Sequence, residues 1–114
     1  QVRTAFGLMA ASAGLAIVLS EVTSNTATAT MLVPVVINIA KSAGIDPIPP
    51  ALAATFGCSF GFMLPVSTPP NALAYGTGMV PIATMVKRGA IFDVIGFVLI
   101  VVGIATLVPL FGLK

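Results

Sequence analysis

Four stretches without a charged residue alternate with short polar segments along the chain, and they cover residues 4–20, 22–40, 47–86 and 94–113. Runs of this length without a charge are typical of membrane-embedded helices. The first two predict helices over 4–19 and 27–40, which would be about 24 Å and 21 Å long and thus shorter than the hydrocarbon core of about 30 Å. They favour a re-entrant hairpin over 4–40. A pair of tilted spanning helices joined by a solvated turn is the alternative.

The polar segment between these two helices is Ser20-Glu21-Val22-Thr23-Ser24-Asn25-Thr26-Ala27-Thr28. It holds a carboxylate, an amide and five hydroxyls, and in hydrocarbon each such group without a partner costs a few kcal/mol. Bound ions or an anionic solute would supply the missing partners.

The third apolar stretch is interrupted by Pro65-Val66-Ser67-Thr68-Pro69-Pro70-Asn71. Loop 41–50 precedes it, with Gly44 suited to end a helix and Asp46-Pro47 suited to a turn. We expect a discontinuous helix over 49–79, with a first part at 51–64, a break at the prolines and a half helix from Asn71. At membrane depth the freed carbonyls could coordinate a cation. A proline kink satisfied by neighbouring hydroxyls is the alternative.

An interfacial stretch at 80–86 and a final spanning helix within 87–114 complete the predicted order. The apolar run 89–111 would be about 34 Å long as a helix. Asp93 is expected in the first turn, where a carboxylate favours the helix N-terminus. Lys87-Arg88 is the only basic pair, which weakly favours a cytoplasmic location for that end.

Composition assigns the chain to the integral membrane class, because 58% of its residues are hydrophobic and only 7% are charged. It has no histidine, so transition-metal sites and histidine-based catalysis are excluded within this chain. Its single cysteine, Cys58, is interpreted as a packing residue. A basic face for nucleic acid is lacking. The start at Gln1, without a methionine, is interpreted as a cut through a longer protein.

The two interrupted segments together predict one site. Helices that start at Thr26 and Asn71 would direct positive helix ends and free N–H groups into the membrane, where they suit an anion. Unwound carbonyls and hydroxyls from the same segments suit sodium. Binding of each ion would then raise the affinity for the other, which is the basis of co-transport.

These two segments resemble the paired signatures of the divalent anion/sodium symporter (DASS) family. Residues 20–26 look like its second Ser-Asn-Thr signature, and 64–72 look like the partner motif. The resemblance implies an all-α membrane fold in which 1–86 belong to a transport domain and 87–114 form the last transmembrane helix. It also implies an inverted N-terminal repeat that supplies the other half of the site, an elevator-like movement and a homodimer.

By the same resemblance, a substrate carboxylate would contact Ser24, Asn25, Thr26, Thr68 and Pro70. One sodium ion would bind Ser20, the Thr23 carbonyl, Ser24, Asn25 and the Ser67 carbonyl. The expected activity is sodium-coupled transport of a divalent anion in the inner or plasma membrane, with no other cofactor. The substrate could be a dicarboxylate, citrate or sulfate. With half the site present, the segment alone is not expected to transport.

Three other functions are weighed against symport. In a sodium-independent anion exchanger of the same fold, a basic side chain or an altered ligand would replace sodium, and no basic residue lies near the motifs in the sequence. An intramembrane serine hydrolase would need a base beside Ser24 or Ser67, and neither has a histidine or lysine near it. A purely structural membrane subunit would not depend on Asn25.

Overall fold

The computed structural model describes residues 2–110 and contains five helices and no strand in that range. They are α1 (Val2–Val22), α2 (Asn25–Ser42), α3 (Ile48–Gly57), α4 (Pro69–Gly76) and α5 (Ile82–Leu110). The expected all-α membrane fold is confirmed. Two of these helices, α1 from Thr4 and α5, are long and apolar enough to cross a membrane.

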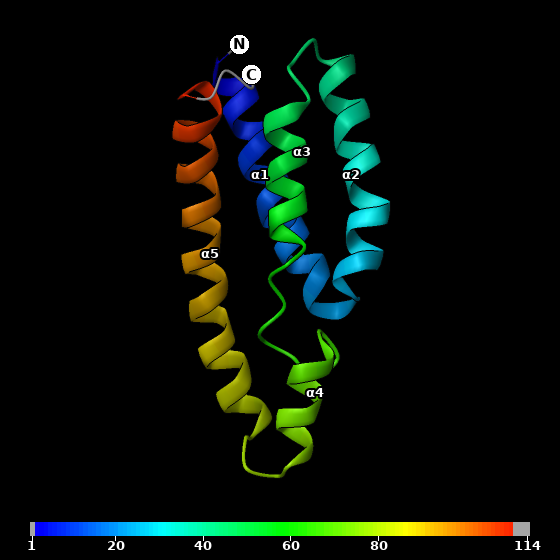
Figure 1. Cartoon of the computed structure of the whole chain (residues 1–114), viewed down its shortest axis with the longest axis vertical. Helices are drawn as coiled ribbons and strands as arrows, with labels where there is room; N and C mark the ends of the chain where they lie inside the picture. The colour runs from blue at the N-terminus through cyan, green and yellow to red at the C-terminus, as the bar shows by residue number, and fades with distance from the viewer. Residues whose placement is uncertain (1, 111–114) are drawn as a thin grey trace.

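The helices lie nearly parallel to one long axis in a body measuring 49 × 24 × 20 Å. Figure 1 shows that α1 and α2 form an antiparallel hairpin, α3 lies in front of α1 and between α2 and α5, and α4 continues beyond the hairpin tip. The tip therefore stops part-way along the molecule, at the level of the extended segment that joins α3 to α4.

Helix α3 forms the centre of the packing because small residues on two of its faces contact different neighbours. Ala53 packs into one buried cluster with α1 and α5 residues, whereas Ala54 and Cys58 pack into another with α1 and α2 residues. At Gly57 a Cβ would lie 2.8 Å from the Ala13 carbonyl oxygen, so only glycine lets the two backbones approach this closely.

Loop geometry follows the sequence at the end of α2. Gly44 has a φ of 73°, and the N–H groups of Gly44 and Ile45 donate to the carbonyls of Lys41 and Ala40, as in a Schellman motif. The side chain of Asp46 then accepts a hydrogen bond from the N–H of Ile48 at the start of α3. Both roles expected for this loop are confirmed.

Other helix bounds differ from expectation. The hairpin helices are longer than expected, with 21 and 18 residues, because residues up to Val22 stay helical and α2 begins at Asn25. Helix α3 ends at Gly57 and not at residue 64, so the break covers 58–68. Pro69 and Pro70 do not interrupt a helix; they occupy the first turn of α4, where a missing N–H costs nothing.

The last helix also starts earlier than expected. It begins at Ile82 and includes Lys87 and Arg88, so most of the stretch expected at the interface is helical. Asp93 is consequently not in the first turn; it lies eleven residues further on and is buried. The bounds beyond Leu110 fall outside the described residues.

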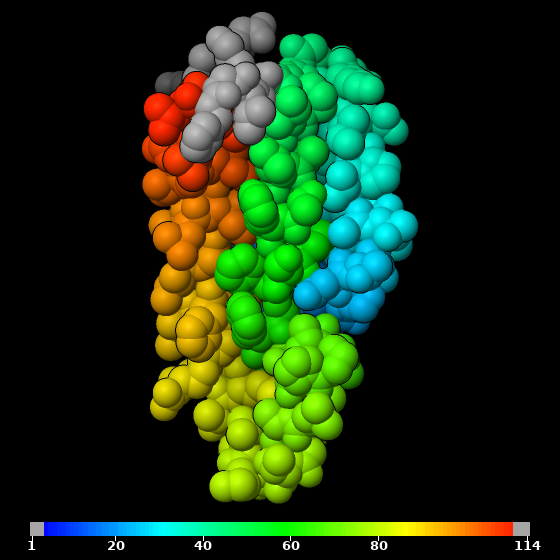
Figure 2. Space-filling model, in the orientation of Figure 1, coloured from blue at the N-terminus to red at the C-terminus, as the bar shows by residue number. Residues whose placement is uncertain are grey.

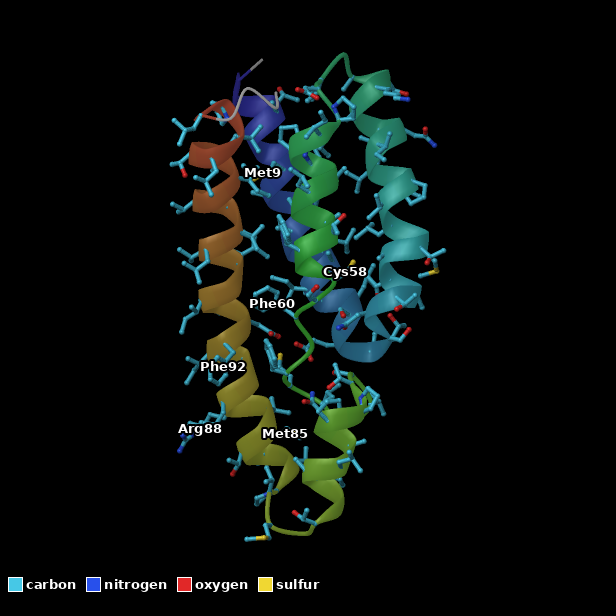
Figure 3. The ribbon with its side chains drawn as sticks, viewed as in Figure 1. Met9, Cys58, Phe60, Met85, Arg88 and Phe92 are labelled. Carbon is cyan, nitrogen blue, oxygen red and sulfur yellow. The ribbon has the colours of Figure 1, made fainter. Side chains whose placement is uncertain are left out.

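The broken segment is held on one side by α5. A Cβ at Gly89 would overlap the Phe62 carbonyl group, and a Cβ at Gly96 would overlap the Phe60 ring. Phe60 and Phe62 make an edge-to-face pair, with ring centroids 5.7 Å apart. Figure 3 shows Phe60 between the end of α3 and α5. Gly89 therefore lets the backbone of the broken segment lie against α5, and Gly96 makes room for the Phe60 ring.

Candidate functional site: the hairpin tip and the break between α3 and α4

The hairpin tip and the broken segment meet at Gly61. A Cβ at this position would lie 3.1 Å from the Ser20 carbonyl oxygen, 3.1 Å from the Ser67 Cβ and 3.4 Å from the Asn25 Oδ1. Ser20, Asn25 and Ser67 come from two segments more than forty residues apart, yet they surround one point on the backbone. The structure therefore brings together three of the residues that the sequence proposed for sodium.

Oxygen atoms converge around Ser20, which is fully buried at the end of α1. Its hydroxyl lies 2.7 Å from the Cys58 carbonyl oxygen and also contacts the Asn25 Oδ1. A hydroxyl has one proton, so it cannot donate to both oxygens. When it donates to Cys58, the hydroxyl keeps two lone pairs, which can accept from an amide N–H or coordinate a cation.

Glu21 ties the hairpin to the broken segment. Its Oε1 accepts a hydrogen bond from the N–H of Met63 at 2.9 Å and lies 3.0 Å from the Ser67 hydroxyl. The same hydroxyl donates to the Glu21 carbonyl oxygen at 2.5 Å. Both Glu21 and Ser67 are buried, so these bonds replace water contacts that neither residue can make.

Two helix N-termini open at this level, each capped by a hydroxyl. Ser24 caps α2 by accepting from the N–H of Ala27 at 3.0 Å, and Thr68 caps α4 by accepting from the N–H of Asn71 at 3.3 Å. A capping hydroxyl uses a lone pair and keeps its own proton. Both caps can therefore still donate to an anionic oxygen placed at the two positive helix ends.

Two unwound carbonyls complete the polar surface. Neither the Thr23 nor the Ser67 carbonyl oxygen accepts a hydrogen bond from another group within residues 2–110. The Thr23 hydroxyl, in contrast, is engaged locally, since it donates to the Leu19 carbonyl and contacts the Thr28 hydroxyl at 2.5 Å. Thr23 and Ser67 can therefore offer a cation their main-chain carbonyl oxygens rather than their side-chain oxygens.

The residues proposed for the anion lie at the outer edge of this cluster, and Asn25 also directs its Oδ1 inward toward Ser20. Ser24, Thr26 and Pro70 are exposed, and Asn25 and Thr68 are partly buried. Thr26 lies in the first turn of α2, and its carbonyl accepts from the Thr30 hydroxyl. The structure places all five residues at the two capped helix ends.

Sequence reasoning missed several residues that shape this site. Asn71 was expected only to start the half helix, but its Nδ2 donates to the carbonyls of Gly61 and Leu64 at 2.6 and 2.9 Å and so closes the broken segment. Glu21 received no role, although a lone carboxylate in an apolar stretch was a signal that it has one. Nothing in the local sequence distinguished Gly61 from the other glycines.

The large hollows of the described residues do not coincide with this polar cluster. One of about 490 Å³ lies between α3 and α5 and has Ser59 as its single polar residue. Another of about 470 Å³ lies between α1 and α5. Figure 2 shows α3 and the broken segment exposed between α2 and α5, with α4 projecting below the hairpin. The cluster therefore has a buried part around Ser20 and Ser67 and an exposed part at Ser24 and Thr26.

Known proteins with similar sequences identify the family. Residues 5–113 match the family described as "Sodium:sulfate symporter transmembrane region". The chain belongs to this family. The match covers both polar segments and all five helices, so the resemblance inferred from the two motifs is confirmed.

Individual relatives agree with the family assignment. The chain is 47% identical over 102 residues to an uncharacterized transporter of Haemophilus influenzae, with 90% of this chain and 21% of the relative covered. It is 38% identical over 91 residues to the sodium-dependent dicarboxylate transporter SdcS of Staphylococcus saprophyticus, with 80% and 18% covered. It is 37% identical over 87 residues to a Na(+)/citrate cotransporter of Rattus norvegicus, with 76% and 15% covered.

The chain spans about a fifth of the length of these relatives. All three are named as transporters, which confirms that the chain is part of a transporter family and not an enzyme. The sodium in two of the names agrees with sodium as the expected coupling ion.

Proposed function

We propose that the protein containing this chain couples sodium entry to transport of a divalent anion, and that this chain supplies one sodium site and part of the anion site. The convergence of Ser20, Asn25 and Ser67 on Gly61 carries the proposal. Polar groups from a hairpin tip and from the break between two helices meet there, as they do at the ion sites of carriers built from broken helices.

The sodium ion binds the hydroxyl of Ser20, the side chains of Ser24 and Asn25 and the carbonyls of Thr23 and Ser67. Two observations support this ligand set. The Ser20 hydroxyl faces two acceptors with one proton, and neither carbonyl accepts a hydrogen bond from the described residues. Hard oxygen ligands of this kind suit a hard monovalent cation.

The anion binds at the two capped helix ends through Ser24, Asn25, Thr26, Thr68 and the first turn at Pro70. Free hydroxyl protons and two positive helix ends favour a carboxylate or sulfate oxygen there. The names of the relatives point to a dicarboxylate or citrate, and the family description points to sulfate. Because Ser24 and Asn25 serve both ions, each ion stabilises the other and transport of the two is coupled.

The position of the tip supports the proposed architecture. The hairpin ends at the level of the broken segment, part-way along the molecule, which favours a re-entrant hairpin over two spanning helices. Residues 1–86 then belong to a moving transport domain, and 87–114 form the final transmembrane helix. An inverted N-terminal repeat provides the rest of the site in a homodimeric, multi-pass protein of the inner or plasma membrane.

Uptake by the full-length transporter in proteoliposomes tests the proposal, with labelled succinate, citrate and sulfate as separate probes and choline replacing sodium. We expect uptake of at least one anion to require sodium. Asn25→Ala should lower sodium-driven uptake about 30-fold or more, because a ligand to both ions is lost. Asn38→Ala, on an exposed position of α2, is the matched control.

Two outcomes would contradict symport. Full uptake in choline would indicate a sodium-independent exchanger. Unchanged uptake by Asn25→Ala, with the same protein level in the membrane, would indicate that this chain has a structural role only.

A further inference from the structure

Thr28 places a buried hydroxyl on an otherwise apolar face of α2, and it is not among the residues proposed to bind either ion. The buried residues of α2 are spaced four apart and are, in order, Thr28, Leu32, Val36 and Ala40. Thr28 is fully buried, with an exposed fraction of 0%. A valine has nearly the same shape, and a buried hydroxyl costs free energy unless it forms a hydrogen bond. The partner of this hydroxyl therefore indicates its role.

That partner is the hydroxyl of Thr23, which lies 2.5 Å away in the turn between α1 and α2. The Thr23 hydroxyl also lies 3.0 Å from the Leu19 carbonyl oxygen, in the last turn of α1. A carbonyl oxygen can only accept, so the bond to Leu19 uses the proton of Thr23. Thr28 then donates to Thr23. The two hydroxyls thus connect the first turns of α2 to the last turn of α1.

The hydroxyl pair crosses the turn, whereas the nearby main-chain bonds stay at one helix end each. The N–H of Thr23 donates to the Leu19 carbonyl at 3.1 Å, which extends α1, and the N–H of Thr28 donates to the Ser24 carbonyl at 3.0 Å, which begins α2. Between them the backbone of Ser24 is extended, with φ −69° and ψ 152°. The Thr23–Thr28 bond therefore restrains the change of direction between the two helices.

This restraint acts on the residue whose carbonyl oxygen is a proposed sodium ligand. The Thr23 carbonyl accepts no hydrogen bond from another group within residues 2–110, so no such bond holds its direction. The Thr23 side chain, in contrast, is held at its hydroxyl by both Leu19 and Thr28. Because threonine is branched at Cβ and stiff at χ1, fixing its hydroxyl also limits the rotation of its backbone.

We propose that Thr28 is a positioning residue for the sodium site: its hydroxyl holds the Thr23 side chain against α1 and so keeps the Thr23 carbonyl directed at the ion. Thr28 is not itself a ligand. The role in sodium binding rests on the proposed function, but the restraint of the hairpin tip by Thr28 does not.

Hydrogen–deuterium exchange of the full-length transporter without sodium tests the restraint directly. Thr28→Val keeps the buried shape and removes the donor, so the amides of residues 20–28 should exchange about fivefold faster than in the wild type. Thr28→Ser keeps the hydroxyl and should stay within about twofold of the wild type. Unchanged exchange in Thr28→Val, or equally fast exchange in both variants, would overturn the proposal whatever the transport activity is.

Sodium chloride titrations of thermal stability test the positioning role, with the same full-length protein, no anion, and choline chloride to keep the ionic strength constant. Thr28→Val should raise the half-saturating sodium concentration about fivefold, and Thr28→Ser should restore it to within about twofold of the wild type. Thr55→Val is the matched control, because it removes an exposed hydroxyl of α3 that donates to the Ala51 carbonyl. An unchanged value in Thr28→Val would overturn the positioning role.

A double-mutant cycle tests whether the two hydroxyls act through one bond. Thr23→Val keeps the proposed carbonyl ligand and removes the acceptor, so it should raise the half-saturating sodium concentration even if Thr28→Val fails to fold. The double variant should stay within about twofold of Thr23→Val. A rise equal to the product of the two single rises would overturn the proposal. Absence of any sodium effect in the wild type would contradict the proposed function instead, and the exchange comparison would still decide whether Thr28 restrains the tip.

Discussion

The two helix N-termini at the site are capped alike but held differently. Helix α2 buries Thr28, Leu32, Val36 and Ala40 along one face, so its first turn is fixed by packing. Helix α4 has eight residues and buries none of them. The described contacts that hold α4 are the hydrogen bonds of Asn71 to the carbonyls of Gly61 and Leu64.

Because of this difference, the two helix ends should respond differently to mutation. The α2 end stays in place when one polar group is lost, whereas the α4 end depends on a single side chain. Segments with few buried contacts are also the ones that move most easily. The experiments below test this contrast, and all use the full-length transporter.

Removing the packing of α2 should have the largest effect. Leu32 is 7% exposed and belongs to the cluster between α1, α2 and α3, so Leu32→Ala should lower stability by about 2–5 kcal/mol. Thermal unfolding in detergent measures this. Met31→Ala, at a neighbouring position that is 57% exposed, is the matched control. Equal losses in the two variants would refute anchorage by packing.

Removing the Asn71 hydrogen bonds that anchor α4 should have the second-largest effect. Asn71→Ala deletes both bonds to the broken segment and leaves two carbonyls unsatisfied, so sodium-driven anion uptake should fall about 10- to 30-fold. Thermal stability should fall less than in Leu32→Ala, because α4 buries no side chain. If uptake were normal, α4 would have to be held by parts of the protein outside this chain.

The sequence predicted the chemistry of this region better than its backbone. A polar segment in a long apolar run is recognisable as a site, because lipid tolerates it only with partners. The end of α3 is not recognisable, because residues 58–64 have no local helix breaker except Gly61. The helix stops where Gly57 meets the α1 backbone and the Cys58 carbonyl meets Ser20, which are contacts between distant segments.

The sequence analysis assigned Pro69-Pro70 and Asp93 to the wrong positions in their helices for related reasons. Pro69-Pro70 signals a helix boundary, which can be either the end of one helix or the start of the next. Here it is a start, because Thr68 caps the N-terminus of α4. Asp93 was assigned to a first turn because the charged pair Lys87-Arg88 was taken as the limit of the helix. The helix continues through that pair, and Asp93 is buried where α5 faces α1.

Loss of the α4 cap should have a moderate effect. Thr68→Ala removes the acceptor for the Asn71 N–H and a proposed donor to the anion, which should cost about 1 kcal/mol and raise the KM for the anion about fivefold. Thr68→Ser keeps the hydroxyl and should behave as the wild type. A Ser variant as impaired as the Ala variant would show that the hydroxyl is not what matters.

The smallest effect on sodium is expected at Ser67, although it lies at the centre of the site. Ser67→Ala keeps the backbone carbonyl proposed as a ligand and removes only the hydroxyl bonds to Glu21, so the half-saturating sodium concentration should change by less than about threefold. Asn25→Ala, which deletes a side-chain ligand, provides the contrast in the same titration. A tenfold or greater rise in Ser67→Ala would mean that its hydroxyl, either directly or through Glu21, sets the sodium affinity.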